Sequence, residues 1–238
     1  MTLSTGSIRR IDALMGLLVA IEGIDGSGKG TQARQLVDQL NSESISTGLL
    51  SFPRYSETLF GRAIGEFLNG EFGPLEAVAP QLSATLYAGD RFESRDVLTE
   101  ALANHQVVVC DRYVPSNLAH QGSRVPAARQ AALIEWIEQI EYEVFGLPRP
   151  DAVVWLDVPP HVSRRLIALK APRDYTEKAA DLQEADLEYQ IGVHQAYRML
   201  AADRDHWFRV DGLVENSEDV RSIEHIGDEV LNIVRRQF

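Results

Sequence analysis

Five short apolar runs are spaced along the chain, with polar and charged segments between them. In the three strongest runs the aliphatic side chains follow one another without alternation, which is typical of strands buried on both faces in a parallel sheet. Each of these runs ends at a carboxylate, namely Glu22, Asp111 or Asp157. The pattern predicts strands at Leu17–Ile21, Val107–Cys110 and Ala152–Leu156, and weaker ones at Gly48–Phe52 and Trp207–Val210.

Helical patterns lie between these strands. Gly146 stops one predicted helix, whose apolar residues recur at helical spacing at Leu133, Ile137, Ile140 and Val144. The last helix is predicted to start from a Ser217 cap and to bury the side that carries Val220, Ile223, Val230 and Ile233. Strand and helix alternate, so the predicted fold is α/β, with a parallel sheet of about five strands between two layers of helices.

Length and composition fit one globular domain. The chain has 238 residues, of which 45% are hydrophobic and 24% are charged, so there is ample material for a core. Neither a repeat nor a linker-like segment divides it. We expect a flexible N-terminal lead-in over residues 1–16 and a single domain over residues 17–238.

The charge and the cysteine count narrow the class of protein. A formal net charge of −12 and the lack of a basic run argue against a nucleic-acid partner, although a few converging Arg and Lys side chains could still bind a small phosphate ester. No apolar run is long enough to span a bilayer, so we expect no membrane partner. Cys110 is the only cysteine, which rules out an internal disulfide and favours a reducing, cytoplasmic location.

A glycine-rich run follows the first predicted strand and opens a helix, which is the context that a P-loop requires. Glycines let successive backbone N–H groups face a phosphate, and the helix N-terminus adds its positive end. Lys29 supplies the charge that bridges the β- and γ-phosphates of ATP. The residues expected to bind ATP here are Gly23, Asp25, Gly26, Ser27, Gly28, Lys29, Gly30 and Thr31.

The residue after the P-loop lysine is unusual. Most P-loops have Ser or Thr there, whose hydroxyl binds Mg²⁺, whereas this chain has Gly30 followed by Thr31. The Lys-Gly-Thr-Gln run is similar to the adenylate-kinase style of loop, in which the metal depends less on that hydroxyl. Asp111, at the carboxyl end of a predicted strand, is a candidate Walker-B-type carboxylate beside the loop.

The segment of residues 170–184 mixes basic, acidic and proline residues with little apolar periodicity. A charge-rich stretch of this kind is usually a solvated loop. In a phosphoryl-transfer enzyme it is also the kind of segment that forms a mobile lid and brings cations over the phosphates. In that case we expect Lys170 and Arg173 to bind ATP, with Lys178 as a further candidate cation.

Further motifs resemble those of the thymidylate kinases, from Leu17 to the last helix. The resemblance implies a three-layer P-loop NTPase fold, a homodimer and the reaction ATP + dTMP → ADP + dTDP, with Mg²⁺ as cofactor and ATP as co-substrate. The motifs that carry it are Ile21-Glu22-Gly23-x-Asp25-Gly26-x-Gly28-Lys29, Phe52-Pro53-Arg54-Tyr55, Asp111-Arg112-Tyr113, Gly146-Leu147-Pro148-Arg149-Pro150-Asp151 and Asp186-Leu187-Glu188.

The resemblance also assigns residues to the dTMP site. Arg54 matches the arginine that holds the dTMP phosphate, a task that suits a planar guanidinium. Tyr87 matches an aromatic position, usually Phe, against the thymine; judged on residue type alone, core packing is an equal alternative. Arg91 matches an arginine that contacts the base. The other residues expected around dTMP are Tyr55, Asn117 and Gln121.

The resemblance also assigns roles to charged residues around the phosphates and the sugar. Asp25 matches a carboxylate near the dTMP phosphate, the sugar 3′-hydroxyl or the metal, and Glu184 is our candidate for a lid carboxylate near the 3′-hydroxyl. Family members carry a catalytic arginine in the phosphate loop or in the lid, and Gly26 and Ser27 leave none in this loop. Arg112 matches the cation between the phosphates of the two substrates. The expected catalytic group is Lys29, Asp25, Arg112 and Asp111, with Asp25 and Asp111 as metal ligands.

His120 is the clearest departure from the family pattern. Tyr or Phe usually stands at this position, close to the 2′ carbon of the sugar, where the ring crowds out a ribose hydroxyl. The imidazole of His120 is smaller and polar. His120 therefore does not support an expectation of strict selectivity for deoxyribose over ribose.

Catalysis in such a site rests on in-line positioning and charge stabilisation, because the acceptor phosphate is already an oxyanion and needs no general base. Another nucleoside or nucleotide kinase of the same fold is the nearest alternative, although the Phe-Pro-Arg and Asp-Arg-Tyr motifs argue against it. A P-loop regulatory module that hydrolyses NTP slowly is an alternative from another class. The sequence has no guanine-reading Asn-Lys-x-Asp run that would support it.

Overall fold

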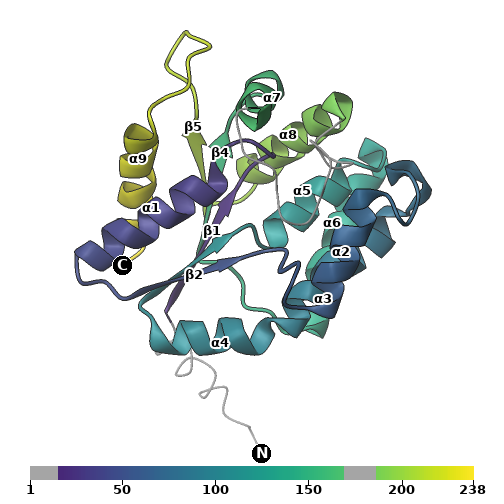
Figure 1. Cartoon of the computed structure of the whole chain (residues 1–238), viewed down its shortest axis with the longest axis horizontal. Helices are drawn as coiled ribbons and strands as arrows, with labels where there is room; N and C mark the ends of the chain where they lie inside the picture. The colour runs from purple at the N-terminus through teal and green to yellow at the C-terminus, as the bar shows by residue number, and fades with distance from the viewer. Residues whose placement is uncertain (1–15, 169–185) are drawn as a thin grey trace, which may run out of the picture.

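The structure of the chain, a computed structural model, describes residues 16–168 and 186–238. The expected lid at residues 170–184 lies outside the described residues, as does all but the last residue of the expected lead-in at residues 1–16. In the described part of the chain, strands and helices alternate in sequence (Figure 1).

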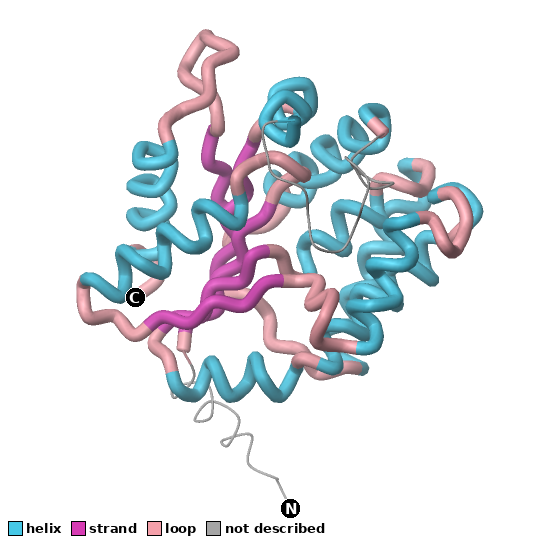
Figure 2. Tube along the Cα trace, in the orientation of Figure 1, coloured by secondary structure: helices cyan, strands magenta, loops and turns pink. Residues whose placement is uncertain are grey.

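Five parallel strands form the central sheet, drawn in magenta in Figure 2. Their order in space is β2-β3-β1-β4-β5, so β1 lies in the middle of the sheet. The five predicted strands are confirmed, each to within one residue at either end. Their bounds are β1 Leu17–Glu22, β2 Thr47–Ser51, β3 Val107–Asp111, β4 Ala152–Asp157 and β5 Trp207–Asp211.

Helices make up most of the rest of the described chain. None of those described combines the length and the apolar character that crossing a bilayer would need. The α-helices are α1 Lys29–Ser42, α2 Leu59–Asn69, α3 Pro80–Glu93, α4 Arg95–Asn104, α5 Val114–Gly122, α6 Ala127–Glu138, α7 Pro160–Ala168, α8 Leu187–Ala202 and α9 Ile223–Arg235. Two shorter helices, one 3₁₀ and one π, are η2 Leu75–Ala77 and η3 Gln139–Val144.

The side chains of each strand alternate between two cores, because successive residues of a strand point to opposite faces of the sheet. On β1, Val19 and Ile21 pack into the core beneath α1 and α9. Leu18 and Ala20 pack into the larger core on the other face. Figure 1 shows α1 and α9 on one side of the sheet and α2, α3, α5, α6 and α8 on the other. The predicted three-layer α/β fold is confirmed.

The helix predicted over residues 133–144 is interrupted in the structure. The α-helix α6 ends at Glu138, and the chain continues as the π-helix η3. A π-turn contains more residues than an α-turn, so it rotates the side chains that follow away from the apolar stripe. Val144, which the spacing predicts to be buried, is 71% exposed, whereas Glu141 is fully buried. The apolar spacing is therefore a wrong guide to burial beyond Ile137.

The predicted start of the last helix is also wrong. Ser222 caps α9, and its Oγ accepts a hydrogen bond from the backbone N–H of His225 at 3.2 Å. Ser217 instead lies in the loop that an antiparallel bridge between Leu213 and Val220 closes. The buried side of α9 consequently carries Ile226, Val230, Leu231 and Val234.

The carboxyl ends of the parallel strands meet at one edge of the sheet, where β1 ends at Glu22, β3 at Asp111 and β4 at Asp157. In open α/β sheets this is the edge at which ligands bind. The glycine-rich loop between β1 and α1 lies at the same edge, so the topology brings the predicted chemical groups together there.

Candidate active site

The phosphate loop has the backbone that its glycines allow. Gly26 and Gly28 adopt φ angles of 81° and 93°, a region that residues with a side chain rarely enter. Gly28 is the N-cap of α1, so the positive end of this helix lies at the loop. The Nζ of Lys29 donates a hydrogen bond to the carbonyl of Ile24 at 2.8 Å and so spans the loop.

Gly30 lies against the predicted Walker-B-type carboxylate. A Cβ atom on this residue would stand 2.8 Å from Oδ2 of Asp111 and 3.6 Å from the guanidinium nitrogens of Arg34. A side chain at this position would therefore require the Asp111 carboxylate to shift.

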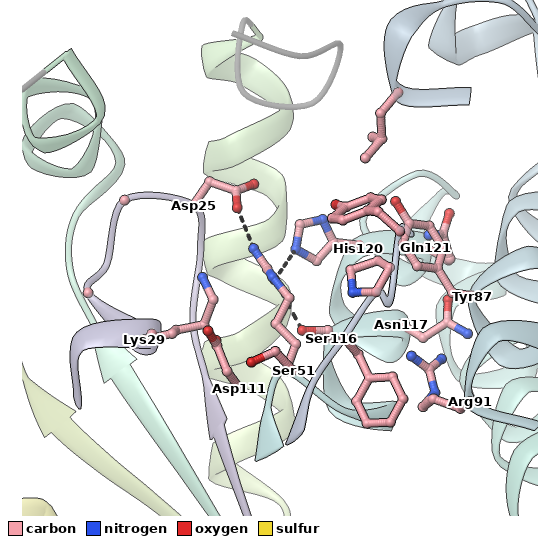
Figure 3. A pocket seen from close by; sticks show the side chains of 18 of the residues that line it. Asp25, Lys29, Ser51, Tyr87, Arg91, Asp111, Ser116, Asn117, His120 and Gln121 are labelled. Atoms are coloured by element: carbon pink, nitrogen blue, oxygen red, sulfur yellow. Dashed lines mark hydrogen bonds and ion pairs between the residues drawn. The ribbon is translucent and has the colours of Figure 1, made fainter. Parts of the chain in front are cut away.

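A cavity of about 550 Å³ extends from the phosphate loop past the ends of β2 and β3 to α3 and α5 (Figure 3). It brings together most of the residues predicted from the sequence. Those that line it are Asp25, Gly26, Gly28, Lys29, Gly30, Tyr55, Tyr87, Arg91, Asp111, Arg112, Asn117, His120 and Gln121.

The other predicted residues are not part of this lining. The expected lid residues Lys170, Arg173, Lys178 and Glu184 lie outside the described part of the chain. Three residues of the phosphate loop and first helical turn are not among the lining residues, namely Gly23, Ser27 and Thr31.

Arg54 is the remaining predicted residue that the cavity lining does not include. Its Nη1 donates a hydrogen bond to Oγ of Ser94 at 3.2 Å, and its Nη2 forms an ion pair with Glu57. Its neighbours Pro53 and Tyr55 both line the cavity. The guanidinium is therefore close to the site but directed to its own protein partners.

Arg112 links the phosphate loop to α5. Its φ of 66° lies in the left-handed region, which costs a residue with a side chain about 1–2 kcal/mol. Strained positions of this kind cluster at functional sites. The Nη2 of Arg112 forms an ion pair with Asp25, and its Nη1 lies 3.1 Å from Oγ of Ser116 and 3.3 Å from Nε2 of His120. Figure 3 shows these contacts as dashed lines.

The partners of His120 fix its tautomer. A guanidinium only donates hydrogen bonds, so Nε2 accepts from Arg112, and Nδ1 therefore carries the proton and donates to the hydroxyl of Tyr189 at 2.8 Å. Burial, and then the positive charge of Arg112, lower the pKa of His120 to about 3. His120 is a neutral ring held in the cavity wall, and it does not exchange protons near neutral pH.

Lys29 loses its proton at a lower pH than an exposed lysine does. Burial, and to a smaller extent the charge of Arg112, lower the pKa of Lys29 to about 7, against the opposing effect of Asp25 and Asp111. An anion beside the amine would raise this pKa again, because it favours the protonated form. The charge of Lys29 and the binding of a phosphate are therefore coupled.

A buried carboxylate lies next to Arg112. Glu22 accepts hydrogen bonds from the backbone N–H of Tyr113 at 2.7 Å, from Oγ of Ser116 at 2.6 Å and from the hydroxyl of Tyr197 at 2.8 Å. Burial raises the pKa of Glu22, while these donors and the charge of Arg112 act against the rise. Glu22 thus orients Ser116, which in turn contacts Arg112.

At the far end of the cavity, the contacts of Asn117 fix its side-chain amide in one orientation. Its Nδ2 donates to the carbonyl of Ala84 at 3.0 Å and to Oε1 of Glu141 at 2.8 Å. Both partners only accept, so the assignment of oxygen and nitrogen follows from the contacts. The Oδ1 of Asn117 has no hydrogen-bond partner among the described residues, although it is buried.

The amide of Gln121 is fixed in the same way, but here the nitrogen, not the oxygen, lacks a partner. Its Oε1 accepts from Oγ of Ser83 at 2.8 Å and from Nη1 of Arg124 at 2.9 Å. Since a guanidinium only donates, the oxygen must face Arg124. The buried Nε2 of Gln121 is then a donor without a partner in the part of the chain that the structure describes. Figure 3 shows Asn117, Gln121 and Tyr87 at the same end of the cavity.

Arg91 is held by a buried ion pair. Its Nε and Nη2 donate to the two carboxylate oxygens of Glu141 at 2.7 Å and 2.5 Å. Burial acts to lower the pKa of Arg91, but the charge of Glu141 and these bonds outweigh it and raise the pKa. Glu141 therefore holds both Arg91 and Asn117 in position from the π-helix η3.

The residues that orient the predicted ones carry little or no signal in the sequence. Glu141 carries one sequence signal, because it lies four residues after Ile137 on an apolar stripe, where a buried acid requires a partner. No local signal marks Tyr197, which meets Glu22 across 175 positions of the chain. The residues missed are Glu22, Ser116, Arg124, Glu141, Tyr189, Gln190 and Tyr197.

A phosphate loop after the central strand of a five-stranded parallel sheet, next to a cavity lined by Lys29, Arg112 and Asp111, defines a P-loop kinase of small phosphorylated molecules. A model of the family described as thymidylate kinase matches residues 21–223. The chain belongs to the thymidylate kinase family.

Individual relatives agree with this assignment. A thymidylate kinase of Mycobacterium tuberculosis is 34% identical over 186 residues, which cover 78% of this chain and 86% of the relative. A probable thymidylate kinase of Pyrococcus abyssi is 31% identical over 229 residues, which cover 94% and 98%. The solved structure of the thymidylate kinase of Candida albicans has a TM-score of 0.69 at 21% identity, covering 93% of this chain and 92% of that one, and has the same fold.

Proposed function

We propose that this chain transfers the γ-phosphoryl group of ATP to the phosphate of dTMP, giving ADP and dTDP. Membership of the thymidylate kinase family supports this reaction. Two residues of the cavity lining support the proposal within the chain itself: Asn117 and Gln121 each keep one buried side-chain atom, an acceptor and a donor respectively, without a hydrogen-bond partner among the described residues.

These two atoms, Oδ1 of Asn117 and Nε2 of Gln121, complement the edge of thymine. Thymine offers a donor at N3–H and an acceptor carbonyl at the next position, so Asn117 would accept and Gln121 would donate. Cytosine offers the reverse pattern, an acceptor at N3 and a donor amino group. Because the partners of both amides prevent them from flipping, cytosine would leave two buried groups unpaired, at a cost of about 1–3 kcal/mol each.

The phosphate end of the cavity supports the transfer step. Lys29 and Arg112 place two cations beside the loop, and the helix N-terminus of α1 adds its partial positive charge. The acceptor oxygen of dTMP is already anionic, so the residues need only align the two phosphates and stabilise the charge that develops. His120 needs no proton-transfer role, which agrees with its neutral state.

Mg²⁺ is usually held by one or two carboxylates together with substrate phosphates. Asp111 fits this mode, because its carboxylate lines the cavity beside the phosphate loop. The other predicted ligand, Asp25, receives Arg112 on one oxygen and Gln190 on the other at 3.3 Å. We propose Asp111 as the main protein ligand and Asp25 as the residue that orients Arg112. When bound, Mg²⁺ would neutralise part of the phosphate charge.

The remaining site assignments are proposals of the same kind. Tyr87 would pack against the thymine, and Tyr55 would line the path to the acceptor phosphate. Arg54 would reach that phosphate by exchanging its partner Glu57 for the ligand. A lid cation from Lys170, Arg173 or Lys178 would approach the transferred group. We also propose that the protein is cytoplasmic and works as a homodimer.

A panel of nucleoside monophosphates tests the proposed function. The rate of ATP-dependent phosphorylation would be measured for dTMP, dUMP, dCMP, dAMP and dGMP, with ribothymidine monophosphate included to test the selectivity for deoxyribose. We expect dTMP to have the highest kcat/KM, and dCMP to be lower by at least about 30-fold, since it leaves two groups unpaired. A preference for dAMP or dGMP, or ATP hydrolysis without transfer, would refute the proposal.

The variant Q121E tests directly whether the unpartnered donor of Gln121 recognises the base. A carboxylate keeps the contact with Arg124 but replaces the donor by an acceptor, so the ratio of kcat/KM for dTMP over dCMP should fall at least about tenfold. The matched control is Q139E, which makes the same change at an exposed position of η3 outside the cavity lining. An unchanged ratio in Q121E would mean that Gln121 does not read the base.

A further inference from the structure

The cavity lining contains three arginines, and two of them already have a carboxylate partner. Arg91 is paired with Glu141 and Arg112 with Asp25. Arg34 forms no ion pair or hydrogen bond with any residue that the structure describes. ATP and dTMP together bring several negative charges into the site, and an arginine that is not already paired can offer its guanidinium to phosphate oxygens at the least cost.

The geometry of α1 directs Arg34 to the phosphate loop. Helical side chains tilt toward the helix N-terminus, so Arg34 reaches back over the residue one turn earlier, which is Gly30. Its two terminal nitrogens each lie 3.6 Å from the point where a Cβ on Gly30 would stand. Oδ2 of Asp111 lies 2.8 Å from the same point, so the guanidinium and the carboxylate both approach Gly30.

The acidic residue one turn further along α1 is Asp38. Its i,i+4 spacing from Arg34 permits an ion pair, although the order with the cation nearer the helix N-terminus is the weaker one. Within the described residues no ion pair joins Arg34 to Asp38, and the side chain turns the other way, toward the cavity. The Arg34 guanidinium therefore lies at the cavity, close to Gly30 and to the Asp111 carboxylate.

We propose that Arg34 is a further catalytic residue of the phosphoryl transfer, a cation that donates hydrogen bonds to phosphate oxygens on the Asp111 side of the phosphate loop. This inference rests on the proposed transfer from ATP to dTMP. In that reaction an oxygen of the dTMP phosphate forms a bond to the γ-phosphorus. The bond from the γ-phosphorus to its bridging oxygen breaks, and the electron pair stays on ADP. No proton has to move, and Arg34 stabilises the charge on the oxygens of the transferred group.

Steady-state kinetics of R34Q, R34K and R129Q test this role. R129Q is the matched control, because Arg129 is an exposed arginine of α6 outside the cavity lining. We expect R34Q to lower kcat by more than about tenfold relative to R129Q, with the KM values for ATP and dTMP changed by less than about threefold, because the charge matters most in the transition state. R34K keeps the charge without the planar fork and should recover part of the loss.

Other results would overturn the inference. A loss of kcat in R34Q smaller than about tenfold would make Arg34 a solvated surface residue rather than a catalytic one. Equal losses in R34Q and R34K, accompanied by an equal fall in the thermal unfolding midpoint, would make its role structural. An inactive wild-type chain would instead refute the proposed function and this inference with it. An active wild type with a normal R34Q refutes only the role of Arg34.

Discussion

At the scale of the residue, the two cations at the phosphate end of the site, Lys29 and Arg112, differ in how their charge depends on pH. Lys29 is 7% exposed and has a pKa of about 7, so near neutral pH it loses and regains its proton readily. Arg112 keeps its charge at all accessible pH values, and Asp25 holds its guanidinium in place. The phosphate end of the site therefore combines one fixed cation, Arg112, with one, Lys29, whose charge a bound phosphate restores.

The low pKa of Lys29 predicts that kcat/KM falls as the pH rises above neutrality. The protonated form of Lys29 binds phosphate, and it is lost as the pH rises through about 7. We therefore expect kcat/KM, which reports the free enzyme, to fall by up to about tenfold per pH unit above pH 7. The kcat at saturating substrate should stay flatter, because bound phosphate raises the pKa of Lys29.

K29R is the control for this prediction. Its guanidinium does not titrate in this range. The fall of kcat/KM with pH that is due to position 29 should therefore disappear, whatever the absolute activity of the variant. The profiles would be measured from pH 6 to about pH 9, the range that brackets the expected transition. A K29R profile as steep as that of the wild type would assign the titration to the substrates or to another residue.

At the scale of the element, η3 and α8 hold the predicted residues in position. The π-helix η3 directs Glu141 inward, where it binds both Arg91 and Asn117. Helix α8 supplies Tyr189 to His120 and Tyr197 to Glu22. These two elements set the orientation of the cavity wall, although neither contains a residue to which the sequence motifs assign chemistry.

The effect of η3 is testable with E141Q. This change leaves Arg91, which is 2% exposed, without the carboxylate that neutralises it, and breaking a buried pair in this way costs about 3–5 kcal/mol. We expect a loss of that size in the free energy of unfolding by urea, with a raised KM for dTMP and a nearly unchanged KM for ATP. E138Q in the neighbouring turn removes a pair with Arg204 whose side chains are 27% and 21% exposed, and should cost less, about 1 kcal/mol. Equal stability losses in the two variants would contradict this account.

Strands and motif residues could be predicted from the sequence, whereas the residues that η3 and α8 contribute could not. The strands were predictable because an unbroken apolar run is a local signal, and Lys29, Asp111 and Arg112 because their motifs are local too. The partners of these residues were not, because a buried pair such as Glu22 and Tyr197 joins distant positions. The helix at residues 133–144 was mispredicted because a single π-turn changes the period on which the prediction depends.

At the scale of the whole molecule, two properties act in opposite directions on self-association. The net charge of −12 makes two copies repel each other. Against this, α2 and α3, which pack side by side on one flank of the molecule in Figure 1, leave large apolar side chains uncovered. Leu59 on α2 is 67% exposed and Leu82 on α3 is 64% exposed. We expect this α2–α3 surface to be the contact of the proposed homodimer.

Sedimentation velocity of the full chain tests this contact with one variant and one control. In L82D a charge replaces an apolar group that would be buried, and the loss of a buried leucine alone is about 1.5–3 kcal/mol, so the dimer should dissociate at concentrations where the wild type stays dimeric. V214D makes a similar change at a residue that is 45% exposed in the loop after β5, at the other edge of the sheet from β2, and should leave the dimer intact.

Raising the salt concentration should strengthen the wild-type dimer, because screening weakens the repulsion between acidic copies while the apolar contact remains. A monomeric wild type would rule out the homodimer, and a dimer that V214D disrupts and L82D leaves intact would move the contact to another surface.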